Sequence, residues 1–500
     1  MLTEYQRYRL YEILPGLSIW VTLILAVAIT FLRPLWMIYF MIVFDIYWVL
    51  KVLHFSFYLV IAWFRYRRTI RIDWGEKMRA VSGWQTKKHI VFLTLLNEEW
   101  PIIESAMNSL ATATYAPEQF VIVIAGEERT AAHHAHIFAR ITDRFASSFG
   151  DIVGTLHPKD LPDEIPGKGS NMHFAEQEMQ KYLEKKQWPI DECVVTVLDI
   201  DTICHPQYFS YLTYLYCTHP RPTRSSYQPI ALYNNNMWES PAMLRLMAFG
   251  TTFWLFTSLA KQDALVTFSS HSMSWQALCD AGFHDKRIVS EDSRIFYQCL
   301  LAYDGDYEVT PMYMPVSMDT VRDDHWWQSI KNLYKQQRRW AWGAEHIPYL
   351  LWHFRLAGKK IPRWQKIKWV FVEWEGKWSW CVVALIITVF GRLPMLVAPL
   401  SIRQSTLFFN APHILARLMT ISMVGLFLSA SLSFPLLPRR PASRSRHVYV
   451  IHLLQWVLLP ISLIFLSAVP AIDAMTHLMF GKYLGFNVSQ KTRKKEYIRQ

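Results

Sequence analysis

Apolar residues gather towards the two ends of the chain and leave a mixed middle. Residues 14–32 form an apolar run about as long as the roughly 20 residues that a helix needs to cross a bilayer. A second apolar stretch, residues 35–64, follows almost at once and is long enough to span with tilt or with one end in the interface. The pattern predicts an N-terminal transmembrane pair over residues 1–66.

The middle of the chain, residues 67–325, alternates short apolar runs with polar, helix-like segments. The runs "HIVFLTLL", "QFVIVIAG" and "ECVVTVLDID" occupy residues 89–96, 119–126 and 192–201. Nearly continuous apolar strands between helical patterns indicate a mostly parallel sheet that is buried on both faces. We therefore predict an α/β domain whose ligands bind at the carboxyl ends of the strands.

Tryptophans and basic residues crowd together in residues 326–376, as expected of amphipathic helices that lie at a membrane surface. Residues 377–500 then form a C-terminal transmembrane region with a basic tail. Its apolar stretches cover about 377–400, 413–437 and 448–470. Five spans would place the basic tail outside the cell, against the positive-inside rule, so a sixth span or a re-entrant piece near 391–402 or 470–481 stays open.

Composition agrees with a membrane protein that carries a sizeable soluble domain, because 52% of the residues are hydrophobic and 18% are still charged. The net charge of +12 is concentrated beside apolar segments, at 65–71, 439–446 and 491–495. This pattern suits the positive-inside rule better than nucleic-acid binding. We expect a multi-pass protein of the cell membrane with a cytosolic middle domain, whose six cysteines, without any C-x-x-C, are reduced.

The third apolar run ends in Asp199-Ile200-Asp201. Along an extended strand, alternation points both carboxylates to one side at the carboxyl end. Two such oxygen ligands can hold a hard divalent cation that takes its other ligands from substrate phosphates. The alternative is a solvated transition from strand to loop.

A second acidic motif, "VSEDSR", places Glu291 and Asp292 about ninety residues later. A carboxylate beside a bound sugar can take the proton from an attacking hydroxyl. The alternative is a helix N-terminus that favours acidic residues, with Ser290 as its N-cap.

The stretch "KQQRRWAWG", residues 335–343, adds a cationic and aromatic cluster. In a helix, Gln336, Arg339 and Trp340 share one face through their i, i+3 and i+4 spacing. An arginine fork matches phosphate oxygens, and an indole plane suits the C–H face of a sugar. The alternative is an interfacial collar beside a membrane segment.

Asp-x-Asp, Ser-Glu-Asp and Gln-Gln-Arg-Arg-Trp, in this order between apolar ends, resemble the membrane-integrated family 2 glycosyltransferases, which include cellulose, chitin and hyaluronan synthases. "LLNEEWPIIESAMNSL" (95–110) resembles the first nucleotide-binding strand and helix of that family, with Asn97 and Glu98 in the loop. "PGKGSNMHFA" (166–175) resembles its lysine-containing loop, with Lys168 near the diphosphate. "FNVSQK" (486–491) is similar to the gating segment of the processive members.

The resemblance implies a GT-A fold and inverting transfer from a nucleotide-sugar, usually a UDP-sugar, with Mg²⁺ or Mn²⁺. It also implies that the product is a growing β-linked polysaccharide, made at the cytosolic face among membrane lipids and passed through the transmembrane bundle. Asp201 and Asp199 would hold the metal and the nucleotide, and Asp292 would be the catalytic base. Gln336 and Arg339 would bind the leaving diphosphate, while Trp340 would stack on the acceptor.

This sequence departs from the family pattern at two places. The second strand ends in "VIVIAGEER", where the family has an aspartate, so Glu127 or Glu128 must contact the base, and UDP and GDP both stay open. "FSSHSMSW" offers Ser270 and His271 in place of a glycine-containing acceptor loop. Two rival functions also remain, namely single addition to a lipid-linked acceptor and a non-catalytic membrane transporter or scaffold.

Overall fold

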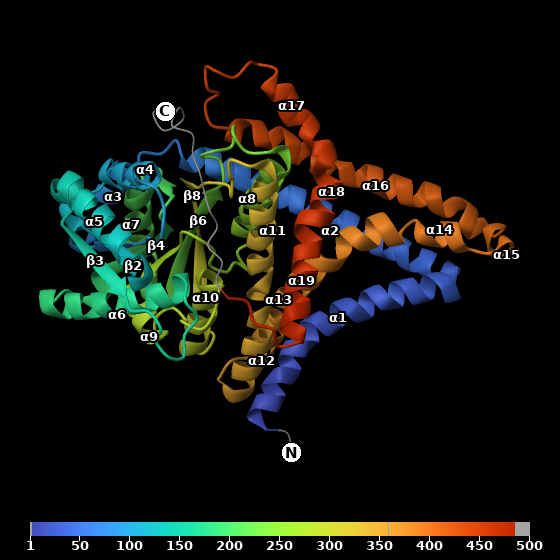
Figure 1. Ribbon diagram of the computed structural model, residues 1–500, viewed down its shortest axis with the longest axis horizontal. Helices are drawn as coiled ribbons and strands as arrows, with labels where there is room; N and C mark the ends of the chain where they lie inside the picture. Colours follow the sequence, from blue (N-terminus) through green and yellow to red (C-terminus); the bar gives the residue numbers. More distant parts are fainter. Residues whose placement is uncertain (1–2, 359, 486–500) are drawn as a thin grey trace.

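The computed structural model describes residues 3–358 and 360–485. Two long helices, α1 (Glu4–Leu32) and α2 (Pro34–Thr69), lead into an α/β domain, and the chain returns to long helices after it (Figure 1). Pro34 begins α2, where its missing N–H costs no hydrogen bond. The predicted N-terminal pair of apolar segments is therefore a pair of helices, each longer than its apolar run.

The domain contains an eight-stranded sheet of order β3-β2-β1-β4-β7-β6-β8-β5. Its parallel half consists of β1 (Lys88–Thr94), β2 (Phe120–Glu127), β3 (Asp151–His157) and β4 (Cys193–Asp199). A second parallel pair, β6 (Ser225–Leu232) and β8 (Glu308–Ser317), joins through the antiparallel β7 (Ser272–Ser274), and β5 (Ile203–Cys204) lies antiparallel on β8. The expected mostly parallel α/β sheet is confirmed, with β5 and β7 as antiparallel additions.

The three strands predicted from apolar runs are found within a few residues of their expected bounds. Every residue of β2 is buried, as are the central residues of β1 and β4, because helices cover both faces of the sheet. These helices are α4 (Trp100–Ala111), α5 (Ala131–Phe145), α6 (Lys168–Lys186), α7 (Tyr208–Thr218), α9 (Trp275–Asp280) and α10 (Glu291–Ala302), with the short α3 (Trp74–Arg79) before the sheet.

Helix α8 (Ala242–Lys261) is an apolar helix that the hydrophobic pattern did not reveal as a separate element. It packs against the sheet, where the Thr252 hydroxyl donates to the Ala231 carbonyl of β6 at 3.1 Å. From β8, the Tyr313 hydroxyl donates to the Leu259 carbonyl at 2.9 Å. Because α8 is apolar around most of its circumference, it is buried between the sheet and α2.

The part of the described chain after β8 consists of helices and their connections. They are α11 (Trp326–Ala341), α12 (His346–Leu356), α13 (Arg363–Leu385), α14 (Leu393–Val397), α15 (Leu400–Arg403), α16 (Thr406–Ser433), α17 (Val448–Leu454), α18 (Leu459–Leu463) and α19 (Val469–Met479). Helix α13 begins well before the predicted start of the apolar stretch at 377, because its amphipathic first turns continue into the apolar part without a break.

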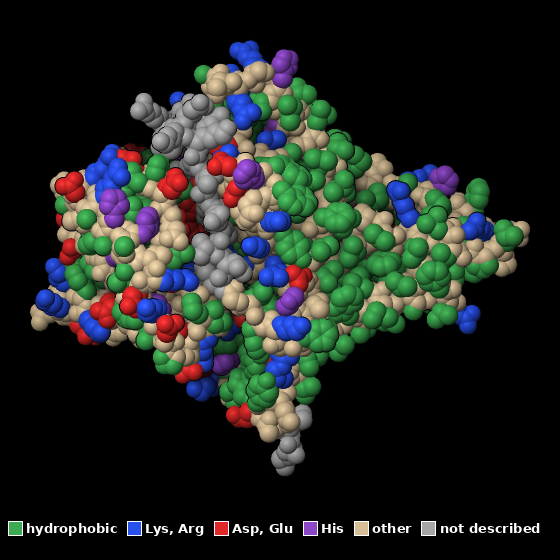
Figure 2. All heavy atoms as spheres, viewed as in Figure 1, with side chains coloured by type: hydrophobic (Ala, Val, Ile, Leu, Met, Phe, Trp, Pro, Cys, Tyr) green, Lys and Arg blue, Asp and Glu red, His purple; other side chains and the backbone are tan. Residues whose placement is uncertain are grey.

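Six helical segments in the described residues are long and apolar enough to cross a membrane. They are Glu4–Leu32, Pro34–Thr69, Ala242–Lys261, Arg363–Val397, Thr406–Leu436 and Val448–Met479. Apolar side chains cover the surface of the long helices, whereas charged side chains gather on the α/β domain (Figure 2). The surface is therefore divided into a charged part on the domain and an apolar part on the long helices, which is consistent with a membrane protein.

The long helices differ in how they meet the sheet. Helix α2 contacts β8 directly, where Arg65 donates to the Tyr313 hydroxyl at 2.8 Å, whereas α1, α14 and α16 extend away from the domain (Figure 1). Helix α19 packs along α11, and α8 packs along α2. The segment 486–491, which resembles a gating segment, lies outside the described residues.

Candidate active site

The first acidic motif lies at the carboxyl end of β4, in the middle of the sheet. Asp199 is the last residue of the strand, and it accepts hydrogen bonds from Lys168 Nζ at 2.9 Å and from Ser269 Oγ at 3.1 Å. Asp201 is buried in the following turn, where its Oδ2 accepts a hydrogen bond from the Asp319 amide at 2.8 Å. The turn, rather than alternation along a strand, brings both carboxylates to one cavity.

Lys168 connects the two acidic motifs. It is the first residue of α6, and its ammonium lies 3.0 Å from both carboxylate oxygens of Asp292 and 3.7 Å from Glu291. Burial acts to lower the pKa of Lys168, but the charges of Asp199, Asp292 and Glu291 outweigh it and raise the pKa above its ordinary value. Lys168 is therefore a permanent cation at the point where the two motifs meet.

The neighbouring carboxylate Glu291 has a different environment from that of Asp292. Burial and the charge of Asp292 raise the pKa of Glu291 to about 7, although Lys168 and Arg339 act in the opposite direction. Asp292 is only half-buried and lines the cavity. Both acids line the cavity, but the side chain of Asp292 is 22% exposed and that of Glu291 only 4%, so Asp292 is the more accessible to a bound molecule.

The second half of the site comes from α11. The predicted helix is confirmed, and Gln336, Arg339 and Trp340 line the cavity. The Trp340 ring packs edge-on against Phe268 with its centroid 6.0 Å away. Arg338 turns instead to α19, where it donates to Asp473 at 3.0 Å. Gln336, Arg339 and Trp340 therefore face the cavity, whereas Arg338, on the adjacent face, holds α11 against α19.

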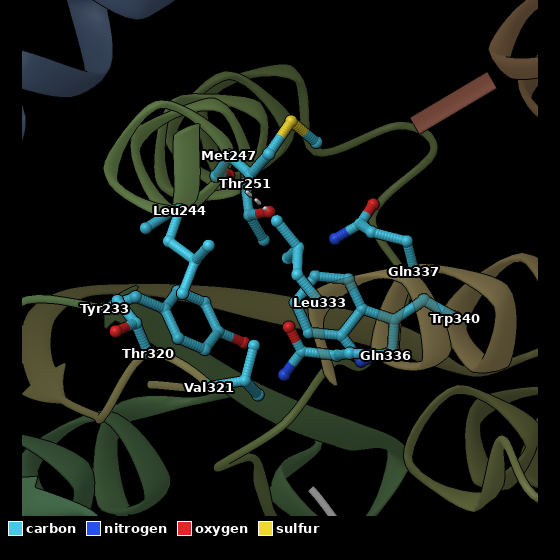
Figure 3. Close-up of a pocket in the computed structure, with 11 residues that line it drawn as sticks. Tyr233, Leu244, Met247, Thr251, Thr320, Val321, Leu333, Gln336, Gln337 and Trp340 are labelled. Carbon is cyan, nitrogen blue, oxygen red and sulfur yellow. Dashed lines mark hydrogen bonds between the residues drawn. The ribbon is translucent and has the colours of Figure 1, made fainter. Parts of the chain in front are cut away.

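A close contact between α11 and α8 supports this face. Figure 3 shows Gln336, Gln337 and Trp340 of α11 around a small space, together with Tyr233 and with Met247 of α8. The space measures about 10 Å³, which is room for roughly one water molecule. The tight packing fixes α11 between the sheet and α8.

Nine of the ten predicted site residues line a single cavity of about 1060 Å³. They are Glu98, Glu127, Lys168, Asp199, Asp201, Asp292, Gln336, Arg339 and Trp340. Asn97, the tenth, is exposed and is not among the lining residues of this cavity. Glu127, rather than Glu128, reaches the cavity, and it pairs with Arg129 at 2.9 Å.

The cavity continues from the sheet to the long helices. Its lining includes Trp48 and Lys51 of α2, Trp380 of α13, Met419 of α16 and Leu463 of α18. Lys51 forms an ion pair with Glu375 of α13 at 2.9 Å, and both side chains line the cavity. The acidic cluster and the membrane-facing helices therefore share one continuous space.

Some site residues were not found from the sequence. Ser269 reaches the cavity, whereas neither Ser270 nor His271, the predicted substitutes for the acceptor loop, is among its lining residues. Ser270 has φ +68°, the left-handed region that favours glycine, so this position keeps a glycine-like backbone. Tyr233, at the end of β6, lines the cavity without any motif to mark it.

Few side chains of the cavity can serve as ligands of a metal ion. Within residues 3–358 and 360–485, no group of three or more His, Cys, Asp or Glu residues has the geometry to hold a metal. Asp199 and Asp201 still present two carboxylates to the same cavity. This set fits a hard cation that takes most of its ligands from phosphate oxygens and water.

A model of glycosyl transferase family group 2 matches residues 194–469, which is more than half of the chain. The chain belongs to this family. The match begins in β4 and includes the Asp-x-Asp, Ser-Glu-Asp and Gln-Gln-Arg-Arg-Trp motifs. This family 2 glycosyltransferase therefore uses nucleotide-sugars, and its mostly parallel, Rossmann-like sheet is the expected GT-A fold.

Solved structures with a similar fold include a mannosyltransferase, PcManGT, from Pyrobaculum calidifontis in complex with GDP-Man and Mn²⁺. The similarity covers 84% of this chain and 99% of that chain, at 13% identity and a TM-score of 0.38. TarS 1–349 of S. aureus in complex with UDP-GlcNAc matches over 80% of this chain and 94% of its own, at 11% identity and a TM-score of 0.36. No curated protein matches the sequence.

Proposed function

We propose that this family 2 glycosyltransferase is an inverting, metal-dependent enzyme that extends a β-linked polysaccharide at the cytosolic face of a membrane and passes the product between its long helices. One observation carries the proposal, namely the single cavity that holds both acidic motifs, Arg339 and Trp340 and continues to α2, α13 and α16. Trp48 and Trp380 line the far part, and such aromatic faces suit a sugar chain.

Asp292 is the proposed catalytic base. It takes the proton from the acceptor hydroxyl as that oxygen attacks the anomeric carbon, and the bond from this carbon to the diphosphate oxygen breaks on the opposite face. The nucleoside diphosphate leaves with the electron pair. Negative charge then builds on the phosphate oxygens, which Lys168, Gln336 and Arg339 bind. Trp340 stacks on the acceptor sugar.

Asp199 and Asp201 are the proposed ligands of Mg²⁺ or Mn²⁺. When bound, such a cation supplies positive charge to the leaving phosphates. At the carboxyl ends of β1 and β2, Glu98 and Glu127 line the cavity and are the proposed contacts of the nucleotide, with Asn97 in the same loop as Glu98. A uridine nucleotide is the proposed donor, and a guanosine nucleotide is the alternative.

The orientation in the membrane rests on which candidate helices cross it. Helix α8 packs on the sheet through Thr252, in its middle, and Leu259, near its end. The run Val448–Met479 starts beside the domain, where Tyr449 packs edge-on against Trp238 at 5.8 Å, and it ends along α11 and α1. Four segments then remain as crossings, namely α1, α2, α13–α14 and α16.

Four crossings leave both ends of the described chain on the side of the catalytic domain. The start of α1 agrees, because Tyr8 packs edge-on against Trp352 of α12 at 5.8 Å. Basic residues follow the same division: those near the domain are Arg65, Arg67, Arg68, Arg71, Arg439, Arg440, Arg444 and Arg446, and those at the far ends are Arg33, Arg392 and Arg403. On the positive-inside rule, we propose that the domain faces the cytosol, and we propose the plasma membrane as the location.

Cysteine labelling tests this orientation in intact cells. Gln404 lies between α15 and α16, Ser443 lies between α16 and α17, and both are exposed. Each is replaced by cysteine in a separate variant. An impermeant maleimide is expected to label position 404 from outside and position 443 only after permeabilisation. Labelling of position 443 in intact cells would contradict the orientation.

A lipid-linked acceptor with single addition is the second candidate. The observation in its favour is the apolar lining at the far end of the cavity, where Ile387, Met419, Leu459 and Leu463 meet. Such a wall also suits the hydrocarbon chain of a lipid carrier. The two candidates share the donor site and differ in the product.

The deciding experiment supplies the purified protein in detergent with a panel of UDP- and GDP-sugars and Mg²⁺ or Mn²⁺, with Asp292→Asn as the inactive control. Nucleotide release and product size are measured together. A long chain made by the protein alone supports the polysaccharide and excludes single addition, whereas one sugar on an added lipid carrier supports the second candidate. Failure to turn over any nucleotide-sugar would revive a non-catalytic transporter or scaffold.

A further inference from the structure

One face of α10, the helix that begins with the Ser-Glu-Asp acids, makes hydrogen bonds to two segments that follow the Gln-Gln-Arg-Arg-Trp motif. Ser290, Ser293, Arg294 and Tyr297 follow i, i+3, i+4 and i+7 spacing and so share a face. Each has a partner in residues 345–346 or in α13, and Arg294 also contacts Asp285 at 3.5 Å. Neither motif in the sequence indicates this connection.

The side chain of Glu345 joins the two motifs directly. Its Oε1 accepts a hydrogen bond from Ser290 Oγ at 2.8 Å, and its Oε2 accepts one from the Trp342 indole N–H at 3.0 Å. Ser290 is two residues before Asp292, and Trp342 is two residues after Trp340. One carboxylate therefore ties the backbone beside the proposed base to the backbone beside the proposed acceptor platform.

The next residue, His346, makes a second tie. Arg294 Nε–H donates to Nδ1 of His346 at 3.1 Å, so this nitrogen must be unprotonated. The proton then resides on Nε2, which donates to Ser293 Oγ at 2.7 Å. Burial and the charges of Arg294 and Lys377 hold the pKa of His346 well below its ordinary value, in agreement with a neutral ring.

The same helix face also reaches the long helices. The Tyr297 hydroxyl donates to Glu373 of α13 at 2.6 Å, and Glu373 lines the cavity near the Lys51–Glu375 pair. The Arg294 guanidinium lies over the Tyr349 ring of α12 at 3.9 Å. The helix with the proposed base is thus held by α12 and α13 as well as by residues 342–346.

We propose that Glu345 and His346 are positioning residues that set the place of Asp292 relative to Trp340. The inference rests on the proposed role of Asp292 as the base. A misplacement of about 1 Å between reacting groups costs roughly 10²-fold in rate. The donor half of the site has a link of its own, because Lys168 donates to Asp199 at 2.9 Å. Loss of the tie therefore lowers the rate of transfer and leaves donor binding intact.

The test compares Ser290→Ala, which removes one hydroxyl from the tie, with Ser290→Thr, which keeps it. Ser105→Ala is the matched control, because its hydroxyl donates only to the Pro101 carbonyl of its own helix at 2.8 Å, away from the cavity. We expect kcat for transfer to fall about 10- to 100-fold in Ser290→Ala, with Kd for the donor within about twofold of wild type. Ser290→Thr is expected to recover most of the rate, and Ser105→Ala to be unchanged.

The double variant Ser290→Ala with Glu345→Gln tests whether Ser290 and Glu345 act through the hydrogen bond between them. If they do, the kcat of the double variant is expected to be no lower than that of the slower of the two single variants, Ser290→Ala and Glu345→Gln. Unchanged kcat in both single variants would overturn the inference, as would a parallel fall in donor affinity, thermal midpoint and kcat. If the wild-type protein transfers no sugar at all, the proposed function fails instead.

Discussion

Replacement of Lys168 by methionine tests the charge centre of the site. The ammonium of Lys168 lies 2.9 Å from Asp199, 3.0 Å from Asp292 and 3.7 Å from Glu291, and its side chain is only 8% exposed. Methionine keeps most of the volume and removes the charge. Three carboxylates then face one another without their common cation.

The expected cost follows from burial. Two unit charges 4 Å apart interact by about 4 kcal/mol at the effective dielectric constant of a protein surface. Removal of one partner from a buried ion pair typically costs about 3–5 kcal/mol. Asp199 and Asp292 are partly exposed, at 27% and 22%, so we take the lower end, about 3 kcal/mol. Donor binding and sugar transfer are expected to be lost as well.

Thermal unfolding in detergent measures this cost, with Lys181→Met as the matched control on the same helix. Lys181 pairs with Glu178 at 2.7 Å, but its side chain is 70% exposed, and surface pairs contribute little. We expect Lys168→Met to lower the midpoint by several degrees and Lys181→Met to leave it unchanged. Equal midpoints in the two variants would refute the reasoning that Lys168 neutralises the carboxylate cluster.

Three further outcomes follow from the site. Asp292→Asn is expected to lower sugar transfer about 10²- to 10⁴-fold while donor binding and membrane insertion persist, and full activity would remove it from the role of base. Trp340→Ala is expected to raise KM for the acceptor about 3- to 10-fold, with Trp340→Phe intermediate; an acceptor KM equal to that of wild type would show that the ring does not stack. Burial raises the pKa of Glu345 to about 7 from 4.5, so its contribution to stability is present below about pH 4.5 and is lost as the pH rises through about 7. The thermal midpoint measured between pH 4 and 8 should therefore fall less steeply with rising pH in Glu345→Gln than in the wild type. Identical slopes would contradict the raised pKa of Glu345.

The sequence predicted the parts of the fold that depend on local pattern. The apolar runs at 89–96, 119–126 and 192–201 became β1, β2 and β4, because a strand buried on both faces needs a continuous apolar run. α8 was missed as a separate element, since a helix that is apolar around most of its circumference has no polar side to mark its period.

The topology of the membrane part needed tertiary contacts. The length and hydropathy of the helices give six candidate spans within the described residues, because these criteria measure how apolar a segment is and not what covers it. Helix α8 packs on the sheet as well as along α2, and α19 packs along α11 as well as along α1, so both lie between the domain and the long helices. If neither α8 nor α17–α19 crosses, as we propose, four crossings remove the conflict between five spans and the basic residues.

The three motifs by themselves determined the residue types of the site, since carboxylates, an arginine fork and an indole plane are what a nucleotide-sugar requires, and nine of ten predicted residues line one cavity. Only the tertiary structure decided how the motifs connect. Lys168 bridges two acidic motifs that lie 31 and 124 residues after it, and Glu345 bonds to Ser290, 55 residues before it. Such contacts carry no local period, because they arise when distant elements pack, and packing is a property of the whole chain.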